Sequence, residues 1–580
     1  MLASTAHPPQ ERSEVRPASA GPFSPLASGW MVLALVLLAA AVRVVWASRV
    51  RAIWGDEPYY LWIGQSLLNG NGYRLFDYSG SHFAPLFPLL AALIARLAQA
   101  FGLPAPQSLM AGSAAVYVIS GSLLVLPVYG IARRLTGSMA ALAAGAVMAV
   151  SPPLAVGALL WGTMTEPLFL LLIACAWWSL LVAQQENHLW AYLCAGASLG
   201  LAYLVRNEAL VYLVAGLAVL LALRVGQRRL IPRTLGGCGL ALAVFALLIS
   251  PYLVAQYIQT GQFQLTEEAG FAYTSMQGLV KGDTSVFDQA TWGLDPASGE
   301  VFLFAPASED ANLLGAIAAD PRTFARLLRI NVDALIAKGL SARLIPWPLA
   351  ALAALGLFFQ PWDARRARGE LLVAASLAGS LSFLFFFIQE RYLAGALIAA
   401  TVWIGEGAAA LGTWLVQTIG AIGGKSETGD EQAIRRPAAA LLSVLPTVLL
   451  VLALLWQGPR LWADMQQTHS FQPGHLLAAE KLRELGASDD AVVMSRYPAI
   501  AFHAGTRWAP TPAAAWSEVA SYAQKHNARY LVIDEWETRL RPQFRALLDP
   551  ATAQAGLRHL ATLDAGAGPV VLYEFTGAQP

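Results

Sequence analysis

"IWGDEPYY", residues 53–60, places two adjacent carboxylates, Asp56 and Glu57, just beyond a long apolar run that covers residues 30–48. That run is long enough to cross a bilayer, which takes about 20 apolar residues. Aromatic side chains follow the acids at once, as they do in the aromatic belt of a membrane interface. The stretch therefore predicts a chain that crosses a membrane and emerges beside a pair of acids.

The composition agrees with this interpretation. Of the 580 residues, 56% are hydrophobic and only 13% are charged, whereas about 25% of the residues of a soluble domain are charged. Such a composition is typical of an α-helical polytopic membrane protein surrounded by lipid. The formal net charge of +1 argues against a nucleic-acid partner, because no global basic footprint is present.

Apolar runs of spanning length predict about eleven transmembrane helices. They lie near 30–48, 108–130, 139–158, 164–183, 190–205, 209–223, 235–257, 342–360, 371–388, 393–416 and 437–456. Residues 1–28 are rich in Pro, Ser and Ala and predict a disordered cytoplasmic tail. A cleaved signal peptide is the alternative, but the first apolar run begins late and contains Arg43.

Arginine and lysine predict the orientation. With the N-terminus in the cytoplasm, the basic residues of nearly every cytoplasmic loop fall on that side, as the positive-inside rule requires. They include Arg133, Arg134, Arg224, Arg228, Arg229, Arg233, Arg365, Arg366, Arg368, Lys425, Arg435 and Arg436. The odd number of spans then leaves the loops 49–107 and 258–341 outside, together with the C-terminal segment.

The C-terminal segment 457–580 has a different character from the transmembrane domain, 29–456. "DDAVVMS", "ARYLVID" and "PVVLYEF" predict buried strands, and "GHLLAAEKLRELG" and "AAWSEVASYAQKHN" have amphipathic helical spacing. Strands that alternate with helices indicate a small α/β domain, which we expect to be an extracytoplasmic accessory domain. The loop 258–341 is long enough to be either a lid over the acceptor cavity or an ordered cap.

Polar residues at the predicted external level extend the candidate site. Glu166 lies in "WGTMTEPLF", Arg206 and Glu208 in "LVRNEAL", and Arg391 and Tyr392 in "FFFIQERYL". Ionisable groups next to membrane spans are costly, so they indicate functional sites.

Each of these residues also has a structural alternative. Asp56, Glu57 and Glu166 stand beside prolines that suit the first turn of a helix, where an acid caps the N-terminus. Arg206 and Glu208 can form a local pair, and a lone Arg391 can reach from a span to the interface. Their convergence on one face favours function.

Together these motifs resemble the polytopic C-type glycosyltransferases, in the branch with protein O-mannosyltransferases and lipid A aminoarabinose transferases. The matching elements are "WGDEPYYLWIGQSLLNGNGY", "HFAPLFPLLAAL", "TEPLFLLL", "LGLAYLVRNEALVYL" and "QERYLAGALIA", in order through about the first 410 residues. Their spacing resembles that of bacterial members, which implies the bacterial inner or plasma membrane. Relatives commonly carry Lys or Arg near the paired prolines, whereas this chain has "SHFAPLFP", so His82 is the nearest polar candidate there.

The resemblance implies a glycosyltransferase that moves a sugar from a polyprenyl-phosphate donor to a protein, lipid or cell-envelope glycan at the external face, with inversion. An acceptor hydroxyl needs a base, and Asp56, beside Glu57, is the candidate. The lipid-phosphate leaving group needs cations or hydrogen-bond donors. Arg391, Arg206, Tyr392 and His82 are the candidates for that role, and Glu166 and Glu208 for supporting roles.

Two alternatives stay open. A divalent metal ion could neutralise the phosphate, with Asp56 or Glu57 as an oxygen ligand. No His and Cys cluster of the kind that forms a closed zinc site is present in the sequence. A transporter or flippase of lipid-linked glycans would also carry charges among many spans, although we find no internal repeat of the sort common in transporters.

Overall fold

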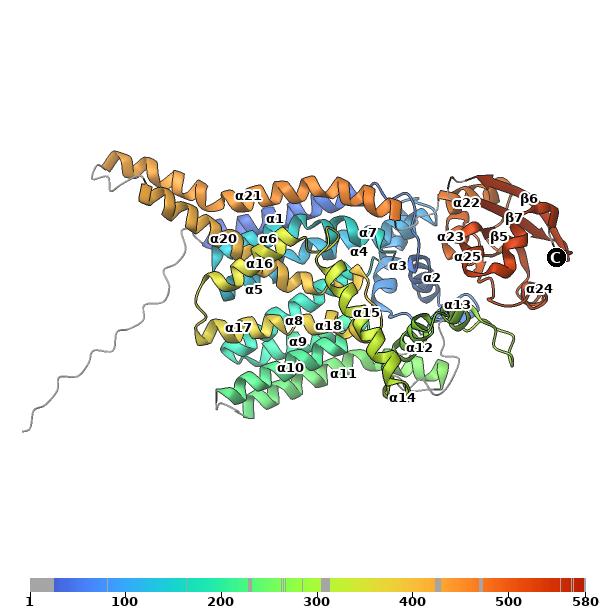
Figure 1. The fold of residues 1–580 in the computed structure, drawn as a ribbon, viewed down its shortest axis with the longest axis horizontal. Helices are drawn as coiled ribbons and strands as arrows, with labels where there is room; N and C mark the ends of the chain where they lie inside the picture. Colours follow the sequence, from blue (N-terminus) through green and yellow to red (C-terminus); the bar gives the residue numbers. More distant parts are fainter. Residues whose placement is uncertain are drawn as a thin grey trace, which may run out of the picture.

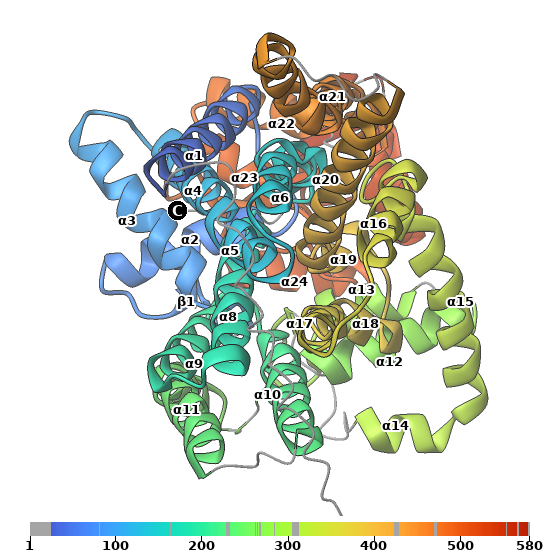
Figure 2. The ribbon, with the colours of Figure 1, turned by 90° about the vertical axis from the view of Figure 1, so that its left-hand side faces the viewer.

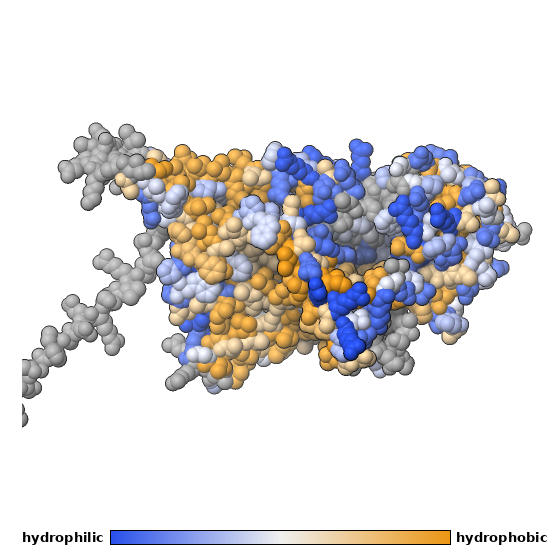
Figure 3. Space-filling view, in the orientation of Figure 1, coloured by the Kyte–Doolittle hydropathy of each residue, from blue (hydrophilic) through white to orange (hydrophobic). Residues whose placement is uncertain are grey.

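The structure is a computed structural model. It describes residues 25–577 apart from 81, 163, 228–231, 262, 264, 266–267, 284, 304–312, 423–428, 469–472, 553, 565 and 567. A long bundle of helices carries a small α/β domain at one end (Figure 1). The viewed surface of the bundle is mostly apolar, whereas the end with the domain is largely hydrophilic (Figure 3). Residues 1–24 of the predicted tail lie outside the described residues, and residues 25–28 belong to the first helix.

Nine helical segments of the described chain are long and apolar enough to cross a membrane. They are Gly29–Ala47, Gln107–Leu135, Ser138–Leu160, Glu166–Glu186, Ala209–Gly226, Pro232–Gln259, Ala364–Phe385, Ala396–Ile419 and Pro437–Gln467. The other two predicted spans, 190–205 and 342–360, form the shorter apolar helices α9 (Leu189–Tyr203) and α16 (Trp347–Phe359). At 1.5 Å per residue these two helices are only about 20 Å long, less than the hydrocarbon thickness of about 30 Å.

The helices of the bundle form two groups, which are visible along the long axis of the bundle (Figure 2). One group holds α8 (Glu166–Glu186), α9, α10 (Ala209–Gly226) and α11 (Pro232–Thr260). The other holds α1 (Pro25–Ala47), α4 (Gln107–Leu123), α6 (Ser138–Val150), α16, α20 (Ala396–Ile422) and α21 (Gly429–Thr468). The helix α5 (Val125–Leu135) packs against both α6 and α8, and so joins the two groups.

Arg43, a charged side chain inside the bundle, is held by backbone carbonyls. Arg43 of α1 is fully buried and donates a hydrogen bond of 2.8 Å to the carbonyl of Ala149. A Cβ at Gly121 of α4 would lie 2.3 Å from the Arg43 Nε, so only glycine leaves room for the guanidinium there. Arg43 therefore links α1 to α6, because it donates hydrogen bonds to backbone carbonyls where water is absent.

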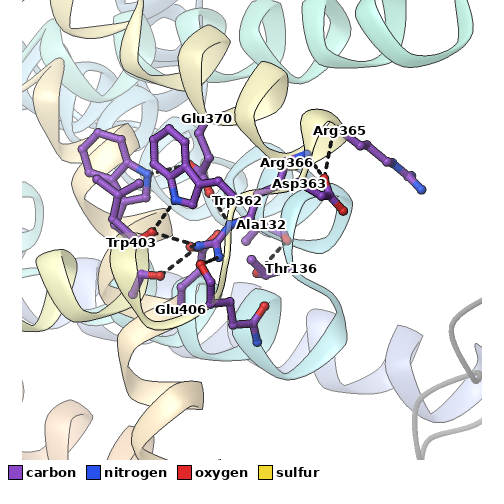
Figure 4. Close-up of polar contacts among 12 residues, drawn as sticks. Ala132, Thr136, Trp362, Asp363, Arg365, Arg366, Glu370, Trp403 and Glu406 are labelled. Carbon is purple, nitrogen blue, oxygen red and sulfur yellow. Dashed lines mark hydrogen bonds and ion pairs between the residues drawn. The ribbon is translucent and has the colours of Figure 1, made fainter.

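A second buried cluster joins α17 (Ala364–Ala374) to α20 (Figure 4). Arg366 lies between two carboxylates, at 3.2 Å from Glu370 and 3.3 Å from Glu406. The indole of Trp403 donates to Glu370 at 2.9 Å. Because these groups hold one another in a desolvated setting, removal of any one leaves an uncompensated partner.

The predicted external segments fold into short helices next to the C-terminal domain (Figure 1). In the first loop, α2 (Glu57–Leu68) packs on α3 (Leu86–Ala100), and the short strands β1 (Arg74–Leu75) and β2 (Tyr78–Ser79) form a hairpin. The helical turn expected at the proline after Glu57 is therefore present. The second loop forms α12 (Glu268–Val280), α13 (Ser285–Trp292), α14 (Leu313–Ala319) and α15 (Pro321–Gly339).

The C-terminal domain is a small mixed α/β unit. Its sheet has the order β4-β3-β5-β7-β6, with β3 (Val492–Met494), β4 (Arg507–Ala509), β5 (Ala528–Asp534), β6 (Leu557–Asp564) and β7 (Pro569–Phe575). The pairs β3–β4 and β3–β5 are parallel, whereas β7 is antiparallel to both of its neighbours. Its helices include α22 (Pro473–Glu484), α23 (Pro498–Ala504), α24 (Trp516–Lys525) and α25 (Glu535–Leu540). The three predicted strands and two predicted helices are present.

Candidate functional site

The acidic loop rests on the turn that precedes α8. The backbone N–H of Asp56 donates to the carbonyl of Gly162 at 2.9 Å, and the N–H of Glu57 donates to the same oxygen at 3.2 Å. Gly55 adopts a positive φ of +63°, and a Cβ at this position would lie 2.9 Å from that oxygen. Glycine is therefore required at 55 both for its backbone conformation and for the close approach of the two chain segments.

The side chain of Asp56 points toward a cation and does not cap the helix. Asp56 occupies the N-cap position of α2, yet its carboxylate makes no capping hydrogen bond. It pairs instead with Arg391 of α19 (Glu390–Leu393), with Oδ2 3.5 Å from Nη1. The capping alternative for this residue is therefore wrong, and the acid and the arginine face each other across two segments far apart in sequence.

Arg391 combines a hydrogen bond with unused donor capacity. Its Nη2 donates to the hydroxyl of Tyr392 at 2.8 Å. Its Nε is buried and has no hydrogen-bond partner within the described part of the chain. A guanidinium presents five donors in a planar fork that matches the oxygens of a phosphate. Arg391 therefore has donors available for an anionic ligand.

Glu57 lies in a different setting from its neighbour. Its side chain is 1% exposed, and neither of its carboxyl oxygens has a hydrogen-bond partner among the residues that the structure describes. Burial, and then the negative charge of nearby Glu166, raises the pKa of Glu57 well above its usual value. Burial therefore favours the protonated form of Glu57 over its carboxylate, whereas Asp56 faces a cation.

Arg206 is held by two acids. It forms an ion pair of 3.0 Å with Glu166, at the start of α8, and a close ion pair with Glu208, at the start of α10. Its guanidinium also lies 5.6 Å from the ring centroid of Tyr392. The local pair of Arg206 and Glu208 is present as the structural alternative predicted, but Glu166 joins it from a distant segment.

Most of these side chains line one small pocket. It is lined by Glu166, Phe169, Leu170, Arg206, Glu208, Tyr212, Phe383, Arg391, Tyr392, Ala394 and Gly395. Five of the eight predicted site residues therefore line the same pocket, and Asp56 reaches its edge through the ion pair with Arg391. The predicted convergence of the polar motifs is present in the structure.

His82 lies apart from the residues that line this pocket. Its ring packs edge-on against Phe83, which in turn contacts the rings of Tyr59 and Tyr60 of α2. His82 is thus part of the aromatic packing below α2, and a role in phosphate binding stays a prediction.

The charges around the pocket do not balance. Asp56, Glu166 and Glu208 carry three negative charges against the two positive charges of Arg206 and Arg391. In the described part of the chain, no three His, Cys, Asp or Glu side chains are placed to hold a metal ion together. An anionic ligand would therefore need a proton or a cation to accompany it, and a metal bound by Asp56 stays a prediction.

The sequence interpretation missed the supports of the acidic loop. Gly162 receives both backbone hydrogen bonds of the two acids. From the C-terminal domain, His503 contacts the backbone of Ile53, 450 residues away in sequence. Gly162 has a positive φ of +80°. No sequence motif around it indicates that it supports the acids. The sequence around His503 likewise gives no indication that it contacts Ile53.

Comparison with known proteins gives one family and two similar folds. Residues 83–254 match the family described as dolichyl-phosphate-mannose-protein mannosyltransferase. No match was found among curated proteins. ArnT from Cupriavidus metallidurans in the apo state aligns with a TM-score of 0.56 and 16% identity, over 96% of this chain and all of that one. Its complex with undecaprenyl phosphate aligns with a TM-score of 0.53 and 14% identity over the same shares.

The archaeal oligosaccharyltransferase AglB from Archaeoglobus fulgidus is also similar. Its complex with an inhibitory peptide and a dolichol-phosphate aligns with a TM-score of 0.55 and 16% identity, over 88% of this chain and 70% of that one. Another structure of an Archaeoglobus fulgidus oligosaccharyltransferase contains Zn and sulfate. At these identities the likeness concerns the fold. The predicted resemblance is confirmed: residues 83–254 match the mannosyltransferase family, and the chain has the fold of the polytopic C-type glycosyltransferases.

Proposed function

We propose that this protein transfers a sugar from a polyprenyl-phosphate donor to an acceptor hydroxyl at the membrane face that carries the C-terminal domain. The family match and the lipid phosphates bound by similar folds support the donor class. The observation that carries the proposal is the ion pair of Asp56 with Arg391 at the edge of a polar pocket beside the spans. In this proposal Asp56 is the base and Arg391 is the cation that binds the phosphate.

The step balances with these groups. The acceptor oxygen attacks the anomeric carbon, and the bond from that carbon to the phosphate oxygen breaks. Asp56 accepts the hydroxyl proton, and the departing lipid phosphate keeps the electron pair and its negative charge. Glu57 is not the base in this scheme, because burial raises its pKa and so disfavours the carboxylate form that a base requires.

Arg391 is better suited than Arg206 to the departing phosphate. Two carboxylates already neutralise Arg206, whereas the one carboxylate paired with Arg391 in the described chain is Asp56. Arg391 also has its free Nε donor and the adjacent hydroxyl of Tyr392. Arg206 then acts mainly to hold Glu166 and Glu208 at the rim of the pocket.

The ion pair has a consequence for the binding order. A phosphate that binds Arg391 competes with the carboxylate of Asp56 for the same guanidinium. Donor binding would therefore separate the pair and leave Asp56 available to the acceptor. In this scheme the proton acceptor becomes free only when the donor is in place.

Kinetics of two charge-neutral variants test the proposal with purified protein and a synthetic polyprenyl-phosphate monosaccharide. Asp56→Asn should lower kcat about 100- to 10,000-fold, the usual worth of a general base. Its donor KM should stay equal or fall, because Arg391 loses its competitor. Arg391→Gln should raise the donor KM about tenfold to 100-fold, the worth of charged hydrogen bonds.

Matched controls come from the exposed surface of the C-terminal domain. Asp489→Asn and Arg545→Gln make the same chemical changes at exposed positions and should leave both constants unchanged. Full turnover in Asp56→Asn would remove it as the base. Movement of intact lipid-linked sugar across vesicles, without cleavage of the sugar–phosphate bond, would instead establish the flippase alternative.

Two finer points belong to the same assay. We propose inversion at the anomeric carbon, and an NMR assignment that shows retention would contradict it. We also propose that a divalent ion can offset the negative excess of the pocket, with Asp56 as one ligand. Loss of turnover on chelation, restored by added Zn²⁺ or Mg²⁺, is the expected result for a metal-dependent enzyme, and unchanged turnover would exclude that dependence.

A further inference from the structure

The C-terminal domain contacts both external loops of the membrane domain. Figure 1 shows it directly beside α2 of the first loop and α13 of the second. The contacts that hold it there lie close to the acids in sequence and in space, so the domain has a direct connection to the candidate site.

The contact nearest to the acids is a histidine against the backbone. In α23, the Nε2 atom of His503 lies 3.2 Å from both the N–H nitrogen and the carbonyl oxygen of Ile53. Both residues are buried, and Ile53 stands three positions before Asp56. Burial lowers the pKa of His503 to about 4, so the imidazole is neutral and forms one of these two hydrogen bonds at a time.

Aromatic contacts from the domain support the start of α2. The ring of Trp508 lies 5.3 Å from that of Tyr59, between centroids, and its own indole N–H donates to the carbonyl of Ser495 at 2.9 Å. Phe502, next to His503, packs edge-on against Trp62 at 5.6 Å. Such pairs contribute packing energy and orient rings. The helix that begins at Glu57 therefore rests on the domain.

A buried charge cluster fixes the domain to the second loop. Asp288 of α13 pairs with Arg496 at 2.7 Å and forms a close ion pair with Arg541, and all three side chains are buried. Both guanidiniums also lie over the ring of Trp292, at 4.4 and 5.4 Å from its centroid. A desolvated cluster of this kind tolerates little displacement. This cluster therefore fixes the side of the domain on which His503 contacts the first loop.

We propose that the C-terminal domain is a working part of the transfer site, with His503 as a positioning residue that fixes the backbone at Ile53 and thereby the place of Asp56. The inference rests on the proposed function for the meaning of that position. Asp56 is held directly by the carbonyl of Gly162 and indirectly, through Ile53, by His503.

The test separates the hydrogen bond from the packing of the ring. In the full-length protein, His503→Leu keeps an apolar side chain without a polar atom, and His503→Gln restores a polar atom near the place of Nε2. The matched control is His559→Leu on the exposed face of β6. Each variant is compared by donor kinetics, by hydrogen exchange of the backbone amides of residues 53–57, and by thermal unfolding.

We expect His503→Leu to lower kcat about tenfold while the donor KM changes less than about twofold, because the base is displaced and the phosphate site is not. Exchange at 53–57 should rise without a matching fall in thermal stability. His503→Gln should recover most of the rate, and His559→Leu should resemble the unchanged protein.

Three results would overturn the inference: unchanged kcat in His503→Leu, unchanged exchange at 53–57, or no recovery in His503→Gln. The last result would assign the effect to packing alone. Absence of sugar transfer by the unchanged protein would defeat the proposed function instead, and the exchange data would then decide whether His503 holds the loop.

Discussion

A single methyl group at Gly55 should separate the position of the acids from the stability of the loop. Gly55→Ala introduces a Cβ 2.9 Å from the carbonyl oxygen of Gly162, about 0.5 Å short of ordinary contact, and the residue has a positive φ of +63°. The loop must move away from Gly162 by about that distance. A displacement of about 1 Å in a catalytic group can cost about 100-fold in rate, so we expect kcat to fall about tenfold.

The same loop offers a matched control in Gly70, which also has a positive φ, +77°, but no atom within 4 Å of an added Cβ. Alanine in the left-handed region costs about 1–2 kcal/mol at either position. Gly70→Ala should therefore lower thermal stability by a similar amount and leave kcat unchanged.

The assay is turnover of a polyprenyl-phosphate sugar by detergent-purified protein, with thermal unfolding measured in parallel. Wild-type kcat in Gly55→Ala would refute the view that contact with Gly162 sets the place of Asp56. An equal loss of kcat in Gly70→Ala would refute it as well, because the loss would then follow from backbone strain alone.

Three further predictions concern the core and the pH response. Arg366→Ala leaves two buried carboxylates without their cation and should destabilise the protein by about 3–5 kcal/mol, seen as a lower Tm, whereas exposed Arg365→Ala should not. Gly121→Ala places a Cβ 2.3 Å from the Arg43 Nε and should cost about 1–3 kcal/mol; an unchanged Tm would show that the guanidinium has room to move. Burial raises the pKa of Glu537 to about 8 from 4.5. The folded protein therefore keeps a proton that the unfolded chain releases, and stability should fall by about 1.4 kcal/mol per pH unit between those values. Glu537→Gln should flatten the fall in Tm between about pH 5 and 8, and an identical pH profile would contradict the assignment.

Patterns within short windows were enough to predict the membrane helices and the strands of the C-terminal domain. A span is defined by its own length and apolar character, because lipid requires every backbone group to be satisfied inside the helix. The two predicted spans that fall short, α9 and α16, have 15 and 13 residues in their helices. Hydropathy alone did not reveal where those helices end.

The sequence by itself also indicated five of the polar residues that line the pocket, since an ionisable group near a span must have a partner or a role. Only the tertiary structure decided how they pair. Asp56 faces Arg391 and does not cap α2, while Glu57, its neighbour, is buried and has no hydrogen-bond partner in the described chain. The contact of His503 with Ile53 joins residues 450 positions apart. Pairings of this kind depend on how distant segments pack, and no local pattern records them, because each side chain has the same sequence neighbours whichever partner it meets.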